Sequence, residues 1–247
     1  MEIDDVFDEL HDAAAQLGVV APDFGTSKGK AYEVWIMLEL VVGLMSRGFD
    51  VHPHDCDDDL EPYFRVSGSP AGMPGKGSKD APCHFTFERH GRAIELHLGL
   101  NHRGISGSTH ELDLTFVHAG GAYAIRQSGG GPWDGAPVVG LELKAYADTH
   151  KLPHDIPRAL LGVALDLDPT WPVTAWTFHT FGGGVRRLSP TFRAGYALLT
   201  ATELHAASDQ YLTHHGVIAR GQVIPGGDVA AIDEVVAMID TGISLFI

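Results

Sequence analysis

Three charged residues on two apolar segments have the residue types and spacing for joint chemistry. The segment PVVGLELKAY carries Glu142 and Lys144 within an apolar run, and the segment HELDLTFV carries Asp113 between two leucines. Successive side chains of a β-strand point to opposite faces, so Glu142 and Lys144 share one face of their strand. Buried charges are costly unless they are paired, hydrogen-bonded or bound to a metal. If the two strands are neighbours, two carboxylates and one ammonium group converge.

Two interpretations of this convergence remain open from the residues alone. In the first, Glu142 and Lys144 form a structural ion pair on a half-exposed face of the sheet. In the second, Asp113 and Glu142 hold a divalent cation, because two close carboxylates raise one another's pKa unless a cation lies between them. Carboxylate oxygens are hard ligands that suit Mg²⁺ or Mn²⁺.

The composition is that of a folded, acidic protein. The 247 residues are 44% hydrophobic and 20% charged, close to the usage of ordinary globular domains. We find no run of about eighteen apolar residues, and the first residues are acidic, so we expect no membrane span, no signal peptide and a cytoplasmic location. Composition does not change abruptly and no repeat is present, which predicts a single domain over residues 1–247.

The net charge constrains the partners. Seventeen Lys and Arg against 32 Asp and Glu leave a formal charge of −15. A protein that binds nucleic acid through its phosphates usually carries a basic surface. The charge therefore counts against a nucleic-acid partner unless a local patch, a subunit or a bound cation reverses the field. Cys56 and Cys83 form no CxxC-type motif, so we expect neither a disulfide framework nor a four-cysteine zinc site.

The apolar pattern predicts several helices. Residues 3–17 have helical spacing with Gly18 as the stop, and residues 31–48 are apolar nearly all round. The second segment is therefore expected to be a central buried helix, and it carries Glu33 and Glu39. Further helices are expected at 154–167, through 189–212 and at 228–240.

The remaining segments predict strands and loops. The expected strands are 49–53, 63–68, a hairpin that turns at His90-Gly91, 110–118, 137–146 and 172–181. Residues 67–82 are expected to form a long loop, and residues 119–136 a glycine-rich connection. A helix between the last two strands predicts a crossover that makes those strands parallel. The fold class is therefore α/β, with a central mixed β-sheet flanked by helices.

This order of elements resembles the PD-(D/E)XK nuclease superfamily, which has the restriction-endonuclease-like fold. The family pattern is a buried helix with a Glu, a strand with an Asp, a strand with Glu-x-Lys, and then a helix and a strand. Here it falls on Glu33, on Asp113 in HELDLTF, and on Glu142-Leu143-Lys144 in GLELKAY.

The resemblance has limits along the chain. It covers a core of residues 31–181, and the N- and C-terminal helical flanks add nothing to it. The helix after the Glu-x-Lys strand would be the one that holds Arg158. Leu112 stands where the family name has a proline.

The resemblance implies a metal-dependent endonuclease that hydrolyses phosphodiester bonds. Asp113 and Glu142 would be ligands of Mg²⁺ or Mn²⁺, the carbonyl of Leu143 would join them, and Glu33 would reach the metal directly or through water. Lys144 would orient or deprotonate the attacking water and offset charge on the phosphorane. DNA is favoured over RNA as the partner, restriction or antiviral defence is the implied setting, and many family members work as homodimers.

Three alternatives accompany this hypothesis. Glu39 could replace Glu33, because six residues turn a helix by about 240° and only one of the two can face the site; the tract KAYEVWIMLEL favours Glu33. A noncatalytic protein with this fold, serving assembly or ligand sensing, is the alternative that the acidic charge favours. A nuclease acting on RNA or on a nucleotide-like small molecule is the other.

Two further clusters have weaker support. Arg186 and Arg187 lie in a glycine-rich segment and would either bind phosphates or form a solvated turn. The run VHPHDCDDDLEP offers several His, Cys and Asp donors, but its spacing matches no closed zinc motif. We interpret this run as an exposed acidic turn.

Overall fold

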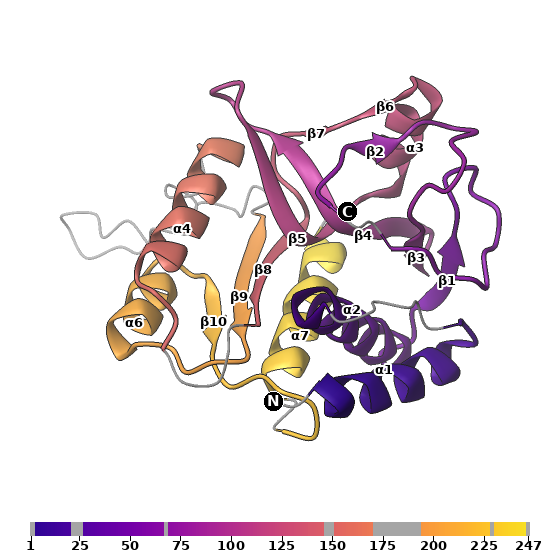
Figure 1. The fold of residues 1–247 in the computed structure, drawn as a ribbon. Coiled ribbons are helices and arrows are strands. Elements are labelled where there is room, and N and C mark those ends of the chain that lie inside the picture. The colour runs from indigo at the N-terminus through magenta and orange to yellow at the C-terminus, as the bar shows by residue number, and fades with distance from the viewer. Residues whose placement is uncertain are drawn as a thin grey trace.

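The computed structural model describes residues 3–20, 27–66, 69–145, 151–169, 194–227 and 230–245. It confirms the α/β class, because a central mixed β-sheet has helices on both faces (Figure 1). The strands are β1 (Asp50–His54), β2 (Met73–Pro74), β3 (His84–Arg89), β4 (Arg92–Arg103), β5 (Thr109–His118), β6 (Gly130–Gly131), β7 (Trp133–Asp134), β8 (Val139–Lys144), β9 (Gly195–Thr200) and β10 (Ile218–Arg220). The helices are α1 (Ile3–Leu17), α2 (Lys28–Ser46), α3 (Ala119–Gln127), α4 (Asp155–Leu167), α6 (Ala206–His214) and α7 (Ala230–Leu245).

The main sheet has the strand order β1-β3-β4-β5-β8-β9-β10. Pairing is antiparallel from β1 to β8 and parallel from β8 to β10, and β7 adds a short parallel pairing to β4. The expected hairpin between β3 and β4 is present. His90 and Gly91 have φ of 55° and 73°, as a two-residue type I′ turn requires. The outermost strands are β1, which contains Pro53, and β10, which has three residues.

Two hydrophobic cores lie on opposite faces of the sheet. Helices α1, α2 and α7 pack over one face in the first core, and α4 and α6 pack over the other face in the second. Alternate residues of β9 separate the two: Ala197 and Leu199 belong to the first core, Tyr196 and Leu198 to the second. A third, smaller hydrophobic cluster joins α3 to β2 through Met73.

Strand β5 contributes to both cores. Leu114 and Phe116 pack in the first core, whereas Leu112 packs in the second. Strict alternation along the strand would place these three side chains on one face. The change of face therefore occurs at Asp113, where alternation is interrupted. The neighbouring strand passes very close here, because a Cβ added to Gly140 would lie 2.6 Å from Cδ1 of Leu112.

Several segments differ from the sequence expectation. Residues 195–200 form β9, parallel to β8, where we expected helix; its side chains are buried on both faces, so helical and strand patterns look alike there. Residues 119–127 form α3 despite their glycines, and the expected loop at 67–82 contains β2, which pairs with β6. Residues 63–66 form only an isolated bridge at Tyr63. The expected strand at 172–181 lies outside the described residues.

Candidate functional site

The candidate site begins where strands β5 and β8 end their pairing. Their ladder runs from Phe116↔Val139 to Leu114↔Leu141, and the same register places Asp113 opposite Glu142. The carboxylate of Asp113 then accepts a hydrogen bond from the backbone amide of Leu143 at 2.6 Å. The side chain of Asp113 thus takes the place of a backbone carbonyl as the hydrogen-bond acceptor at this point of the ladder. The two acid-bearing strands are therefore neighbours, which is the condition that the sequence left open.

Lys144 brings the two carboxylates together. Its Nζ lies 3.3 Å from Oδ2 of Asp113 and 2.6 Å from Oε1 of Glu142. All three side chains are largely buried, with exposures of 22% for Lys144, 10% for Asp113 and 22% for Glu142. One ammonium group therefore contacts both acids.

Helix α2 supplies a third acid. The charges of Asp113 and Lys144 act on Glu33, whose carboxylate also pairs with Lys30 at 2.6 Å. Glu39 has other neighbours: Glu9 of α1 and Trp35. The helix therefore turns Glu33, and not Glu39, toward the two strands. Glu39 instead faces the contact with α1.

Glu111 completes a group that we call the acid–lysine cluster. Its carboxyl interacts electrostatically with Asp113, Glu33 and both lysines of the group. The members of the cluster are Lys30, Glu33, Glu111, Asp113, Glu142 and Lys144. Sequence reasoning missed Glu111 and Lys30. Glu111 could have been found, because it lies two residues before Asp113 on an alternating strand.

Burial and repulsion control the protonation of this cluster. Burial, and then the charge of Asp113, raises the pKa of Glu142 and of Glu33 above the ordinary range. Burial alone would lower the pKa of Lys144, but the carboxylates of Asp113 and Glu142 raise it well above its ordinary value. Lys144 is therefore an ammonium group at neutral pH, and the acids carry a cost when they ionise together.

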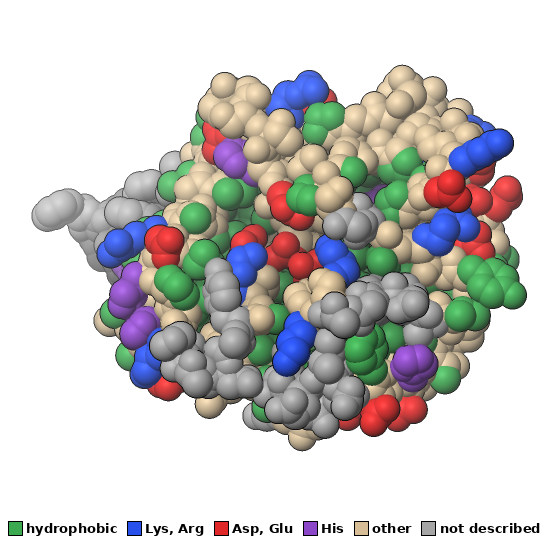
Figure 2. All heavy atoms as spheres, in the orientation of Figure 1, with side chains coloured by type: hydrophobic (Ala, Val, Ile, Leu, Met, Phe, Trp, Pro, Cys, Tyr) green, Lys and Arg blue, Asp and Glu red, His purple; other side chains and the backbone are tan. Residues whose placement is uncertain are grey.

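The charge balance of the cluster favours a divalent cation. Four carboxylates face two ammonium groups, so the ionised cluster has two more negative than positive charges. Figure 2 shows acidic side chains near the middle of the visible face with lysine or arginine side chains beside them. Oxygen donors of this kind suit Mg²⁺ or Mn²⁺.

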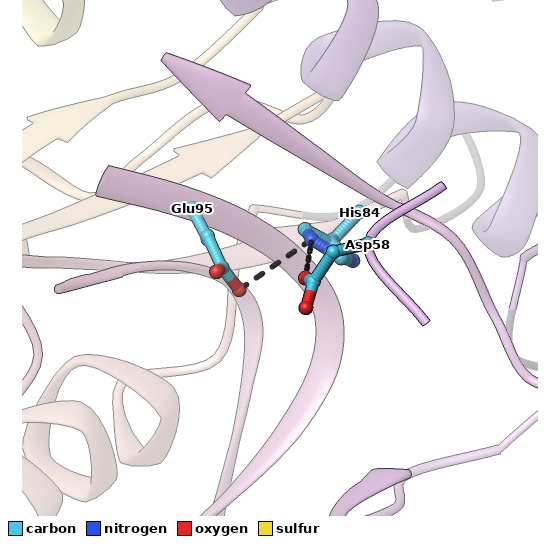
Figure 3. A group of neighbouring side chains, drawn as sticks. All are labelled: Asp58, His84 and Glu95. Atoms are coloured by element: carbon cyan, nitrogen blue, oxygen red, sulfur yellow. Dashed lines mark ion pairs between the residues drawn. The ribbon is translucent and has the colours of Figure 1, made fainter. Parts of the chain in front are cut away.

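A second group could also hold a metal ion. Among the described residues, Asp58, His84 and Glu95 bring one ligand atom each within 4.8 Å of one another (Figure 3). Glu33, Asp113 and Glu142 do not meet that spacing.

The acidic run before β2 contributes to this second group. Our interpretation of an exposed acidic turn is wrong in part, because Cys56 is 3% exposed and Asp58 points to two buried residues. No sequence signal connects Asp58 with His84 and Glu95, which come from other segments. Arg186 and Arg187, for which phosphate binding and a solvated turn were both left open, lie outside the described residues.

A scan against models of known protein families and a search of curated proteins both find no match to the chain. None of the helices in the described part of the chain is long and apolar enough to cross a membrane.

Proposed function

We propose that the chain is a metal-dependent nuclease with a restriction-endonuclease-like core that hydrolyses phosphodiester bonds, with DNA favoured over RNA. The observation that carries the proposal is the contact of one lysine ammonium with both the strand aspartate and the glutamate of Glu-x-Lys. The order of elements supports it: α2 carries Glu33, β5 carries Asp113, β8 carries Glu142 and Lys144, and β9 runs parallel to β8. By analogy with the superfamily alone, we extend the proposal to restriction or antiviral defence.

The chemical types of the donors, which are carboxylate and carbonyl oxygens, suit the proposed cation. Asp113, Glu142 and the carbonyl of Leu143 would hold Mg²⁺ or Mn²⁺, with Glu33 as a further ligand or a partner of its water shell. The two excess negative charges of the cluster match a divalent ion. Such an ion polarises a phosphoryl oxygen and lowers the pKa of bound water.

Lys144 would assist as a cation. Without a cation, the carboxylates of Asp113 and Glu142 raise its pKa, so it is then an ammonium group. It would orient or deprotonate the attacking water and offset the charge that grows on the phosphorane oxygens.

The test is cleavage of supercoiled plasmid and of labelled single- and double-stranded DNA and RNA by the full chain in Mg²⁺ or Mn²⁺. We expect Asp113→Asn and Lys144→Met each to lower the cleavage rate by at least about 100-fold. Asparagine keeps an oxygen that can accept the amide hydrogen of Leu143, so the fold is retained. Lys151→Met is the matched control, because Lys151 forms an exposed pair with Glu203 at 2.5 Å.

Two results would contradict the proposal. Cleavage that persists in Asp113→Asn with the folded spectrum of the wild type would remove the assignment of the site. A wild-type chain that cleaves none of these substrates would favour the noncatalytic alternative, in which the charged strand pair is structural. Cleavage of RNA alone would correct the substrate class.

A further inference from the structure

A buried polar group lies away from the acid–lysine cluster, and the proposed nuclease does not use it. We call it the His84 cluster: Asp58, His84, Glu95, His97 and Arg126. Its residues come from the loop after β1, from β3, from β4 and from the last turn of α3. Three of its members are almost completely buried, with 2% exposure for His84, Glu95 and Arg126.

The hydrogen bonds of the His84 cluster are incomplete. Asp58 Oδ2, His84 Nε2 and Arg126 Nε are buried and have no hydrogen-bond partner among the described residues. Buried polar atoms of this kind cost about 1–3 kcal/mol each when nothing satisfies them. A further group that accepts the lone pair of the His84 imidazole and binds the Asp58 carboxylate would satisfy two of these three atoms.

The spacing around His84 is that of metal ligands. Nε2 of His84 lies 3.6 Å from Oε2 of Glu95 and 3.9 Å from Oδ1 of Asp58, too far for hydrogen bonds. Figure 3 shows the imidazole pointing between the two carboxyl groups. Ligand atoms of a tetrahedral zinc ion, with bonds of about 2.0–2.2 Å, are about 3.3–3.6 Å apart. The observed separations come within a few tenths of an ångström of that geometry.

The surroundings hold these ligands in place. The ring of His84 stacks between those of His54 and His97, with centroids 5.9 and 5.1 Å away. His97 Nε2 lies 2.9 Å from Glu95 Oε2, and the carbonyl of Asp58 lies 2.9 Å from Nδ1 of His54.

Arg126 binds the carboxylates of both Glu95 and Asp58. Its guanidinium donates to both oxygens of Glu95, at 2.6 and 2.8 Å, and to Oδ1 of Asp58. One positive charge faces two negative ones, so a dication in its place would balance them fully. The side chain of Asp58 is 31% exposed and offers an entry route.

We propose that Asp58, His84 and Glu95 form a structural site for a divalent transition metal of the zinc type, and that Arg126 competes with the metal for the two carboxylates. One imidazole and two carboxylates suit Zn²⁺ or Co²⁺ better than Mg²⁺. The metal would tie the acidic loop to β3 and β4, in a place separate from the proposed nuclease site.

The test titrates Co²⁺ into the chelator-treated full chain and follows visible absorption and heat. The wild type is expected to bind one Co²⁺ at this site, recognised by the absorption of a nitrogen- and oxygen-ligated ion. Asp58→Asn should weaken this binding by at least about tenfold, and Arg126→Gln should tighten it. Asparagine tolerates the left-handed backbone of Asp58, whose φ is 68°, so this variant is expected to fold.

The controls separate this site from the other one. Asp113→Asn should leave the Co²⁺ absorption band unchanged, as should His52→Ala, which removes an exposed histidine of β1. A wild-type chain that binds no Co²⁺, or equal binding by the wild type and Asp58→Asn, would overturn the proposal and leave the cluster as an ion-pair network. Loss of the band in Asp113→Asn would move the metal to the acid–lysine cluster.

Discussion

The carboxylate of Asp113 accepts two different donors, the backbone amide of Leu143 and the ammonium group of Lys144. This single side chain therefore ends the pairing of two strands and sets the charge environment of the glutamates around it. Its negative charge raises the pKa of Glu142, of Glu33 and of Glu111, in each case after burial. Ionisation of these glutamates costs stability, and the stability they contribute when protonated is lost as the pH rises through their folded-state pKa.

We expect Asp113→Asn to lower the pKa of Glu33 and of Glu142. The substitution removes the repelling charge and leaves Lys144 free to pair more closely with Glu142. Carbon-detected NMR titration of the side-chain carboxyl groups measures both values. Asp166→Asn is the control, because Asp166 pairs with His110 at 2.6 Å outside the acid–lysine cluster. Unchanged values for both glutamates would contradict the electrostatic description of the cluster.

At the scale of elements, the close approach of β5 and β8 depends on a glycine. A Cβ on Gly140 would lie 2.6 Å from Leu112 and 3.2 Å from Pro137. Leu112 is fully buried in the second core, so it has no room to move away. Gly140 lies two residues before Glu142, and any widening of the strands there would move the acids apart.

Gly140→Ala should therefore lower the free energy of unfolding by about 1–3 kcal/mol, the usual cost of overpacking a core. Gly162→Ala is the matched control. Gly162 lies within α4 with no atom within 4 Å of an added Cβ, so alanine should raise the stability by about 0.5–1 kcal/mol through its better helix propensity. Urea denaturation measures both changes. Equal effects of the two substitutions would show that the strands do not pack as closely as described.

Much of this element layout could be predicted from the sequence, and the failures have physical causes. Apolar periodicity and turn or stop residues predicted α1, α2, β5 and the turn at His90-Gly91. These elements could be predicted because they depend on residues that are close in sequence. Strand β9 was predicted as helix because it is buried on both faces and lacks alternation. Alternation alone predicted that Glu142 and Lys144 share a face, but their contact with Asp113 required the pairing of β5 with β8. The His84 cluster could not be predicted, because tertiary contacts assemble it.

At the scale of the whole molecule, the charge of −15 opposes compaction and repels polyanions. The proposed cation would cancel the negative charge only locally, at the cluster where acids exceed lysines by two. Association with a phosphate backbone would then depend on divalent ions more than on surface arginines. The acidic composition and a nuclease site are compatible on these terms.

Raising the NaCl concentration from about 20 mM to about 300 mM at pH 7.5 should raise the thermal midpoint, because salt screens the repulsion among the excess acids. The effect should vanish near pH 5.3, the isoelectric point, where the repulsion averages to zero. Differential scanning calorimetry at both pH values checks this. A midpoint that falls with salt at pH 7.5 would mean that attractive ion pairs, such as those of Arg126, outweigh the net charge.

The two outermost strands of the sheet have a consequence for how the chain behaves at high concentration. A sheet edge with free amides and carbonyls is a template on which a second molecule can add a strand and start a fibre. Here one edge strand, β1, contains a proline, which has no amide hydrogen to offer, and the other, β10, is only three residues long. In the described part of the chain, both edges therefore discourage growth of the sheet from one molecule into the next, and aggregation by strand addition should be slow.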